Sequence, residues 1–198
     1  ANFIILGCVY MVVMTASSLY LAPPAAGDVP AKAEKESSVE YADAQPQFTV
    51  RRAMKTWQFY AIWWLFFTNI TCGIALLSVA SPMAQDVVGM SPMAAASMVG
   101  FIGLMNGAGR IAWATISDYI GRSATYVLFF VIEILAFWQL AGVTGAFSFQ
   151  VLVLLIISCY GGGFSCMPAY LSDLFGTKYL SAIHGRILSA WAMAGIAG

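Results

Sequence analysis

The feature that most constrains this chain is its long stretches without a charged side chain. Between Ser123 and Ser172, 50 residues carry a single charge, that of Glu133. About 20 apolar residues are enough for a helix to cross the hydrocarbon core of a bilayer. This stretch is too long for one span, so it predicts two, divided near residues 142–145, where two glycines favour a turn.

Charged residues are scarce and unevenly distributed. Only 18 of 198 residues are Asp, Glu, Lys or Arg, and ten of these lie between residues 28 and 55. An average soluble domain carries roughly 25% charged residues, whereas this chain has 9%. A soluble protein of this size would have too much surface for so few charges. The composition excludes a soluble enzyme, a secreted disulfide scaffold and a nucleic-acid binder. It predicts an all-α, polytopic membrane helical bundle.

The apolar pattern predicts five complete spans and most of a sixth. A signal peptide is the alternative for the first run, but no basic segment precedes it and its apolar core is too long. Proline ends two of the predicted helices, because it lacks a backbone donor and disfavours helix before it. The spans are residues 2–22, ended by Pro23-Pro24; 57–81, ended at Ser81-Pro82; Ser91-Pro92 to about Ser117; two within 123–172; and one from near Ala182.

Basic residues occur on alternate connections between the predicted spans. Residues 24–56, a stretch typical of a solvated linker, carry five. Residues 118–123 carry one and 173–186 carry two, whereas 82–91 and 142–148 carry none. The positive-inside rule therefore predicts a multi-pass protein of the cell (inner or plasma) membrane, with the three basic connections in the cytoplasm.

The ninth basic residue, Arg110, lies inside a predicted span. An arginine at the bilayer centre costs about 2.5–3.5 kcal/mol, so it usually faces the bundle interior or a water-filled cavity. Small or polar residues share its helical stripe, and Asn106 lies one turn away. A guanidinium presents a fork of donors that suits a carboxylate. The alternative is a structural arginine, capped by carbonyls or reaching toward the cytoplasm. The stripe consists of Val99, Gly103, Asn106, Gly107, Arg110, Ala114 and Ser117.

Other polar residues within the predicted spans have two interpretations each. Glu133 could be a proton-coupling carboxyl, but a protonated side chain packed against a neighbouring helix is favoured. Isolated polar residues are best explained by hydrogen bonds between helices; these are Asn69, Thr71 and Gln139. The three glycines at 161–163 indicate close helix packing or a bend beside a cavity.

Two connections share a pattern of Asp, then Gly and a basic residue. Such charges at helix ends suggest ion pairs that act as a weak conformational latch, because surface pairs contribute only about 0–1 kcal/mol. The residues are Asp118, Gly121 and Arg122 in the first connection, and Asp173, Gly176 and Lys178 in the second.

No metal site or intramembrane enzyme is expected. The four cysteines lie in apolar runs without metal-ligand spacing. His184 is the only histidine, and it is interpreted as a hydrogen-bonding residue near a helix end. The chain has no HExxH motif.

Several sequence blocks resemble a known family. The segment ATISDYIGR, residues 114–122, resembles the loop motif of major facilitator superfamily transporters. Five blocks in order are similar to the oxalate/formate antiporter family: LYLAPP, SVASPMAQ, NGAGRIAWATISDYIGR, CYGGGFSCMPAYLSDLFGTK and AIHGRILSAWAMAGIAG. The resemblance implies part of a twelve-helix protein. Residues 1–23 would be the last helix of the amino-terminal half, 24–56 the central cytoplasmic linker, and 57–198 the carboxy-terminal bundle without its final helix.

The resemblance also implies roles for particular residues. Arg110 would bind the carboxylate of the substrate, and an acid and a base of the loop motif would stabilise the outward-open state. Aromatic residues of helices 10 and 11 would line the cavity; by position these are Tyr160, Phe164 and Trp191. Two positions of the loop motif differ from the family pattern, Ala114 in place of glycine and Ser123 in place of a basic residue.

A further difference concerns the substrate. Oxalate carriers of this family have a lysine on helix 11, but no lysine occurs from Ile187 to Gly198. One binding cation fits a monoanion better than a dianion. A monocarboxylate such as formate, lactate or pyruvate is therefore favoured over oxalate.

The expected function is secondary active transport of a small organic anion by alternating access, with the site near the bilayer midplane. Asn106 would hydrogen-bond the substrate or orient Arg110. Transport would be exchange, or symport with a proton. The expected partners are the anion, the lipid bilayer and the amino-terminal half of the same protein, with no cofactor and no nucleic acid. The alternative is a membrane sensor or scaffold that binds without translocating.

Overall fold

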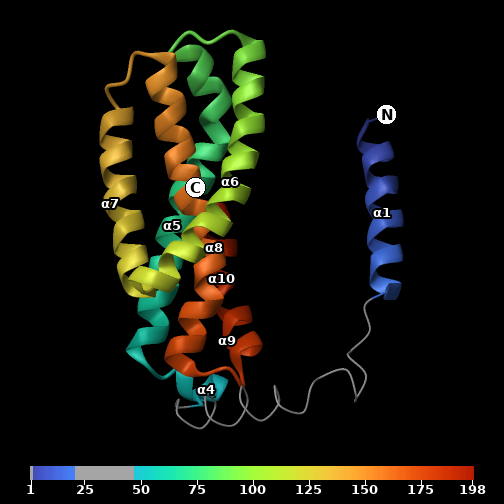
Figure 1. Cartoon of the computed structure of the whole chain (residues 1–198), viewed down its shortest axis with the longest axis vertical. Helices are drawn as coiled ribbons and strands as arrows, with labels where there is room; N and C mark the ends of the chain where they lie inside the picture. Colours follow the sequence, from blue (N-terminus) through green and yellow to red (C-terminus); the bar gives the residue numbers. More distant parts are fainter. Residues whose placement is uncertain (1, 21–46) are drawn as a thin grey trace. The chain divides into compact units, whose positions relative to one another are not determined.

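The computed structural model describes residues 2–20 and 47–198, and these fall into two compact units, Ala1–Ala44 and Gln45–Gly198. The described residues form helices and no strand. The predictions for Pro23-Pro24 and for most of the linker lie outside the described residues. The helices are α1 (Asn2–Tyr20), α4 (Val50–Ala53), α5 (Trp57–Asp86), α6 (Pro92–Ile120), α7 (Arg122–Leu140), α8 (Ala146–Phe175), α9 (Leu180–Ile187) and α10 (Ser189–Ala197) (Figure 1).

The first unit contributes a single described helix. The 19 residues of α1 carry no charge, and those whose exposure is described are exposed along its whole length. A helix that is apolar on all sides is typical of a membrane span. The observed helix agrees with the span predicted from residue 2.

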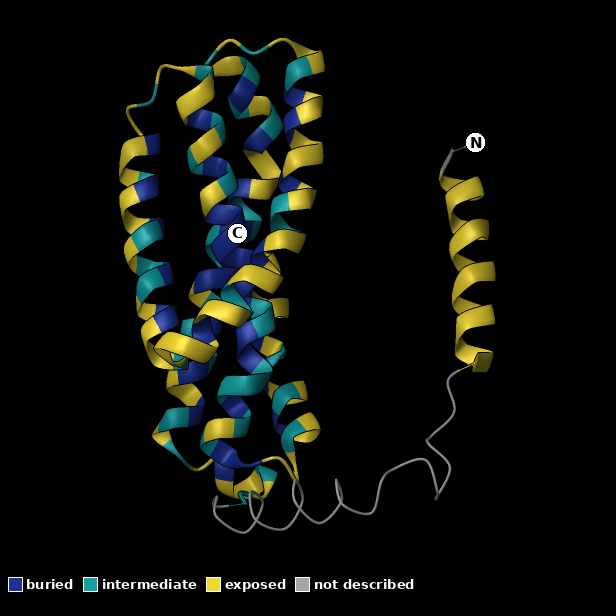
Figure 2. Ribbon diagram, viewed as in Figure 1, coloured by how far each residue is buried: buried dark blue, intermediate teal, exposed yellow. Residues whose placement is uncertain are grey.

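The second unit is built around α8. This helix packs against α5, α6, α7 and α9, and α10 packs against α5. Eight successive residues of α8, 156–163, are buried, so neighbours surround the helix on every side (Figure 2). A helix that is buried all round must be apolar all round, which explains the long uncharged run in this part of the sequence.

Four helices of the described residues are long and apolar enough to cross a membrane: α1, α5, α7 and α8. The 29 residues of α6 make it nearly as long as the 30-residue α5, but it is not among the four. Its charged and polar residues, including Arg110 and Asn106, lower its apolar content. Of the five complete spans predicted from the sequence, the one that corresponds to α6 therefore stays a prediction.

Local signals set most of the helix ends. The Ser91 hydroxyl accepts a hydrogen bond from the amide of Ala94 at 3.3 Å, and Pro92 occupies the first turn, as predicted. The long run at 123–172 divides into α7 and α8 at residues 141–145, which confirms the predicted turn.

One predicted boundary is wrong. Helix α5 does not stop at Ser81 but continues through Pro82 to Asp86. Its final turns are held by packing, because Ala80 and Ala84 are buried, and this packing outweighs the lost backbone hydrogen bond at the proline. The last helix starts at Leu180, close to the predicted start near Ala182, but a break at Leu188 divides it into α9 and α10.

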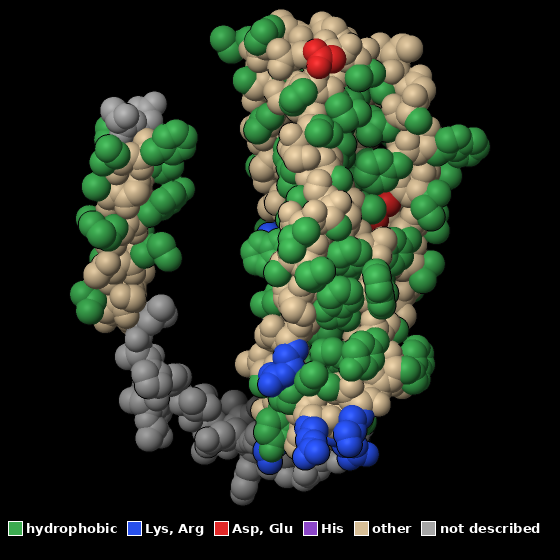
Figure 3. All heavy atoms as spheres, turned by 180° about the vertical axis from the view of Figure 1, so that it is seen from behind, with side chains coloured by type: hydrophobic (Ala, Val, Ile, Leu, Met, Phe, Trp, Pro, Cys, Tyr) green, Lys and Arg blue, Asp and Glu red, His purple; other side chains and the backbone are tan. Residues whose placement is uncertain are grey.

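Most described charges of the second unit lie at the ends of its helices. One end contains the starts of α5, α7 and α9 and the ends of α6 and α8. It carries every described basic residue except Arg110: Arg51, Arg52, Lys55, Arg122, Lys178 and Arg186. Figure 3 shows blue side chains gathered at this end. Among the described residues, Asp86 is the only charged residue at the opposite end. The structure therefore groups the described basic residues of the predicted cytoplasmic connections on one side.

Candidate anion-binding site

Arg110 lies on the exposed side of α6 with neutral partners. Its Nε donates a hydrogen bond to Oδ1 of Asn106 at 3.4 Å, one helical turn earlier. Its Cζ atom lies 5.3 Å from the centroid of the Phe164 ring on α8. No acidic side chain of the described residues lies within ion-pair distance. Arg110 therefore keeps an uncompensated positive charge on the surface of this unit and is not enclosed between its helices.

The three aromatic residues predicted from the sequence are in contact, with Phe164 between the other two. Its ring centroid lies 5.3 Å from that of Tyr160 and 5.4 Å from that of Trp191, both in edge-on geometry. Tyr160 is buried, whereas Trp191 is half exposed. With Asn106 and Arg110, these residues form one continuous chain of contacts across α6, α8 and α10. Their role as substrate ligands stays a prediction.

Sequence reasoning missed one aromatic residue of this cluster. The buried ring of Phe66 on α5 lies 5.3 Å, centroid to centroid, from Phe164. A phenylalanine in an apolar helix carries no signal that separates it from an ordinary core residue. Only the packing of α5 on α8 reveals the contact.

The three glycines of α8 allow neighbouring helices to approach closely. A Cβ atom on Gly161 would collide with the backbone carbonyl of Asn106, and one on Gly162 would lie 2.7 Å from side-chain atoms of Trp113. The indole Nε1 of Trp113 donates to Oγ of Ser158 on α8 at 3.2 Å. Helix α8 is unbroken through the glycines. Close packing therefore explains these residues.

The other polar residues of the spans have different partners. Nδ2 of Asn69 on α5 donates to Oε1 of Glu133 on α7 at 2.9 Å, which confirms an interhelical hydrogen bond. The prediction for Thr71 is wrong, because its hydroxyl donates to the carbonyl of Phe67 in its own helix at 2.7 Å. Gln139 is exposed. Glu133 is buried against α5 and forms no hydrogen bond or ion pair with Arg110.

A single arginine connects the two helix-end motifs. Arg122 forms an ion pair with Asp118, a hydrogen bond with Oγ of Ser117, and an ion pair with Asp173 of α8, whose Oδ2 lies 3.7 Å from its Nε. Gly121 has φ of +88°, a conformation that favours glycine, and it separates α6 from α7. The two acids are more than half exposed, so the pairs contribute only about 0–1 kcal/mol each.

Lys178 lies outside this ion-pair network. Its Nζ lies 5.7 Å from the centroid of the Tyr179 ring, and it forms no ion pair with a described residue. Its backbone amide donates to the side chain of Gln47 at 3.0 Å. The second motif therefore contributes its acid to Arg122 instead of forming a pair of its own.

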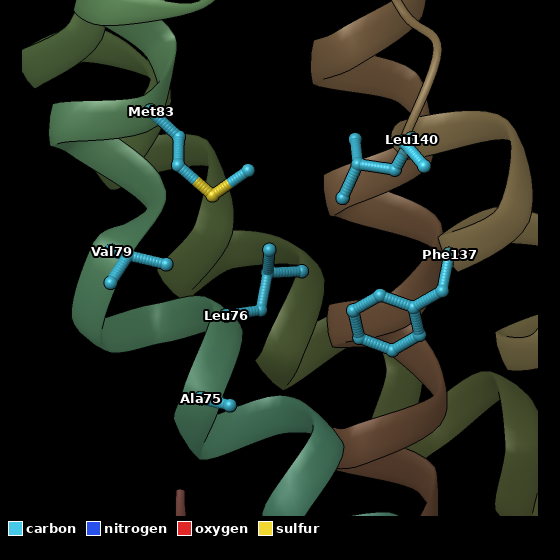
Figure 4. A pocket seen from close by; sticks show the side chains of 7 residues that line it. Ala75, Leu76, Val79, Met83, Phe137 and Leu140 are labelled. Atoms are coloured by element: carbon cyan, nitrogen blue, oxygen red, sulfur yellow. The ribbon is translucent and has the colours of Figure 1, made fainter.

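An apolar cavity of about 270 Å³ lies elsewhere, between α5 and α7. Apolar side chains of the two helices line it (Figure 4). No charged or hydrogen-bonding side chain lines the cavity, so it offers nothing that would select a carboxylate. Its lining residues are Ala75, Leu76, Val79, Met83, Phe137, Leu140 and Ala141.

The apolar helices, the basic residues gathered at one end of the bundle and the unpaired arginine define a polytopic helical membrane protein with a candidate site for an anion. Residues 1–198 match the Major Facilitator Superfamily, and the chain belongs to this superfamily. Its fold is part of the helical bundle of that superfamily.

Three curated relatives are similar to most of the chain. The oxalate:formate antiporter of Oxalobacter formigenes is 29% identical over 153 residues, which cover 76% of this chain and 36% of the relative. Apicoplast pyruvate carrier 1 of Toxoplasma gondii is 26% identical over 162 residues, 75% of this chain and 28% of the relative. An uncharacterized MFS-type transporter of Escherichia coli K12 is 24% identical over 153 residues, which cover 77% of this chain and 38% of the relative. The chain thus spans about a third of the length of these relatives.

Proposed function

We propose that this chain is part of a secondary transporter that carries a small organic monoanion by alternating access. The observation that carries the proposal is the guanidinium of Arg110, which has neutral partners and no described counter-ion. A cation in the middle of a membrane span is costly and is typical of a functional site. Binding a carboxylate would neutralise it.

In this proposal each residue of the cluster has a separate task. Arg110 binds the carboxylate with its free donors, and Asn106 orients the guanidinium through the hydrogen bond to its Nε. Tyr160, Phe164 and Trp191 limit the size of the substrate and exclude water. The counterpart half of the transporter would form the opposite wall of the site.

The substrate class follows from the number of cations. No lysine occurs between residues 187 and 198, so Arg110 has no basic partner on α10. A single cation favours formate, lactate or pyruvate over a dianion such as oxalate. Two of the relatives are named for oxalate and formate and for pyruvate, which supports a small carboxylate. Transport is either exchange or symport with a proton.

The ion-pair network at the basic end would act as a latch in the transport cycle. Arg122 connects α6, the start of α7 and the end of α8, so a relative movement of these helices would break its pairs with Asp118 and Asp173. Weak pairs suit this task, because a latch must open in every cycle. We place this end in the cytoplasm of a cell membrane, following the distribution of basic residues.

The test is uptake and counterflow of labelled formate, lactate, pyruvate and oxalate by the full-length carrier in proteoliposomes. Arg110→Ala should lower transport efficiency by about 10–150-fold or more, since it removes charged hydrogen bonds. Arg110→Lys should be intermediate, because it keeps the charge but loses the planar fork. Arg186→Ala, at the basic end, is the control and should transport normally. Normal uptake by Arg110→Ala, or substrate binding without any counterflow by the unmodified protein, would contradict a carrier that works through Arg110.

A further inference from the structure

The pair formed by Asn69 and Glu133 has no part in the proposed anion site. Asn69 is fully buried and Glu133 is 2% exposed. Their single described hydrogen bond runs from Nδ2 of Asn69 to Oε1 of Glu133 at 2.9 Å. The two remaining oxygens, Oδ1 of Asn69 and Oε2 of Glu133, are buried and have no hydrogen-bond partner among the described residues.

A proton on Glu133 would satisfy both of these oxygens. An ionised carboxylate only accepts hydrogen bonds, and so does the amide oxygen of Asn69, so neither could pair with the other. A protonated carboxyl has one O–H donor, which can bond to Oδ1 of Asn69 while Oε1 still accepts from Nδ2. The two planar groups would then be joined by two hydrogen bonds, and no buried polar atom would be left unpaired.

The surroundings of Glu133 also favour the neutral form. No basic side chain of the described residues forms an ion pair with it. Its titratable electrostatic neighbours are the thiols of Cys72 on α5 and Cys159 on α8, which supply no positive charge. An ionised carboxylate buried without a cation is strongly disfavoured.

The pair is also in contact with the helix that carries Phe164. A Cβ atom on Gly163 would collide with Oδ1 of Asn69, so the amide lies directly against the α8 backbone. From α7, the hydroxyl of Tyr126 donates to the carbonyl oxygen of Gly163 at 2.7 Å. The residue after Gly163 is Phe164, whose ring lies beneath Arg110.

We propose that Glu133 is a protonated positioning residue that forms a carboxylic acid–amide pair with Asn69 and thereby fixes the α8 backbone at Gly163, next to Phe164. The proton stays on Glu133 throughout transport. The pair joins α5 to α7 and holds α8 beside them. Its positioning role rests on the proposed anion site, but its protonation does not.

The decisive variant is Glu133→Gln in the full-length carrier. Glutamine can both donate to Oδ1 and accept from Nδ2 of Asn69, so it reproduces the pair without an ionisable group. We expect this variant to retain the thermal midpoint, the KM and the pH profile of uptake. Glu133→Ala and Asn69→Ala break the pair and should lower the thermal midpoint, because each leaves a buried polar group without its partner. Gln139→Ala, an exposed polar residue of the same helix, is the control and should change none of these.

Infrared spectroscopy tests the protonation without any transport. The unmodified protein should show a protonated carboxyl band across the pH range of the uptake assay, and Glu133→Gln should remove that band. A carboxylate signal from Glu133 would overturn the proposal, as would a Glu133→Gln protein as unstable as Glu133→Ala. A folded Glu133→Gln protein that lacks uptake would instead assign Glu133 as the proton carrier.

The two proposals fail separately. If Arg110→Ala transported normally, the anion site would be wrong, while the infrared band and the thermal midpoints would still decide the state of Glu133. If the band were absent and Arg110→Ala inactive, the anion site would stand and the acid–amide pair would not.

Discussion

The guanidinium of Arg110 has more hydrogen-bond donors than its described neighbours accept. Arginine carries five N–H donors, and the hydrogen bond to Asn106 uses one of them. The ring of Phe164 stabilises the charge by about 0.5–2 kcal/mol without accepting a conventional hydrogen bond. The side chain is thus held in place while most of its donors remain available to a ligand.

Replacing the aromatic ring that lies against Arg110 should weaken substrate binding. Phe164→Leu removes the ring beneath the guanidinium, so we expect the KM for a monocarboxylate to rise by about 2–30-fold, equivalent to losing ~0.5–2 kcal/mol. Uptake kinetics of the full-length carrier measure this. Phe149→Leu is the matched control, because Phe149 is a buried residue of the same helix that packs with a different set of apolar side chains from Phe164. An equal rise in KM for both variants would assign the effect to general loss of packing.

The residues of the candidate site were predictable from the sequence to different degrees. Arg110 and Asn106 were identified from the residues themselves, because a charge inside a span is rare and its stripe is polar. Trp191 entered through family resemblance, and Phe66 was missed, since aromatic residues are common in apolar helices. The partner of Glu133 was not assigned either, because only the packing of α5 on α7 brings Asn69 to it.

At the scale of helices, close contact between α6 and α8 is made by glycine. A side chain at Gly161 would collide with the backbone of Asn106, and one at Gly109 with the backbone of Ser158. Backbone atoms cannot move aside as a flexible side chain can. The spacing of the two helices, and with it the distance from Arg110 to Phe164, depends on these glycines.

Gly161→Ala should therefore destabilise the protein by about 1–3 kcal/mol, the usual cost of overpacking. The measurement is the thermal midpoint of the full-length protein in detergent. Gly100→Ala is the matched control on α6, since a Cβ there meets nothing within 4 Å, and its higher helix propensity should leave stability unchanged or increased. A Gly161→Ala protein as stable as the control would show that α6 and α8 can move apart.

Helix ends were predicted well where a local signal decides them, as at the Ser91 cap. They were predicted less well where packing decides them. Proline normally stops a helix, yet α5 continues beyond Pro82 because its final turns are buried. The break at Leu188 has no comparable marker in the sequence.

At the scale of the molecule, the second unit has two chemically different ends. The described basic residues other than Arg110 gather at one end, and Asp86 is the only described charge at the other. Successive connections from α5 to α9 alternate between the two ends, and the basic residues occur on alternate connections, so they gather at one end. The alternation was readable from the sequence because a missed span would have disrupted it.

Labelling at the two ends of α8 would test the orientation in the membrane. In a cysteine-free background, Thr144→Cys precedes α8 and Thr177→Cys follows it; both threonines are exposed. We expect an impermeant thiol reagent to label position 177 only from the cytoplasmic side and position 144 only from the outside. Labelling of both from the same side would contradict α8 as a span, and the reversed pattern would contradict the assigned orientation.

The glycine contacts of α8 also restrict how substrate preference can change. Backbone atoms set the distance between α6 and α8 at Gly161 and Gly109. Larger or smaller side chains at the contact between these helices therefore cannot widen the proposed site gradually. In the proposed site, a shift toward longer or bulkier acids would have to come from exchanging the rings at 160, 164 or 191, or from the opposite wall. Variation in selectivity among carriers built this way should therefore concentrate in aromatic positions, while the helix crossing itself stays constant.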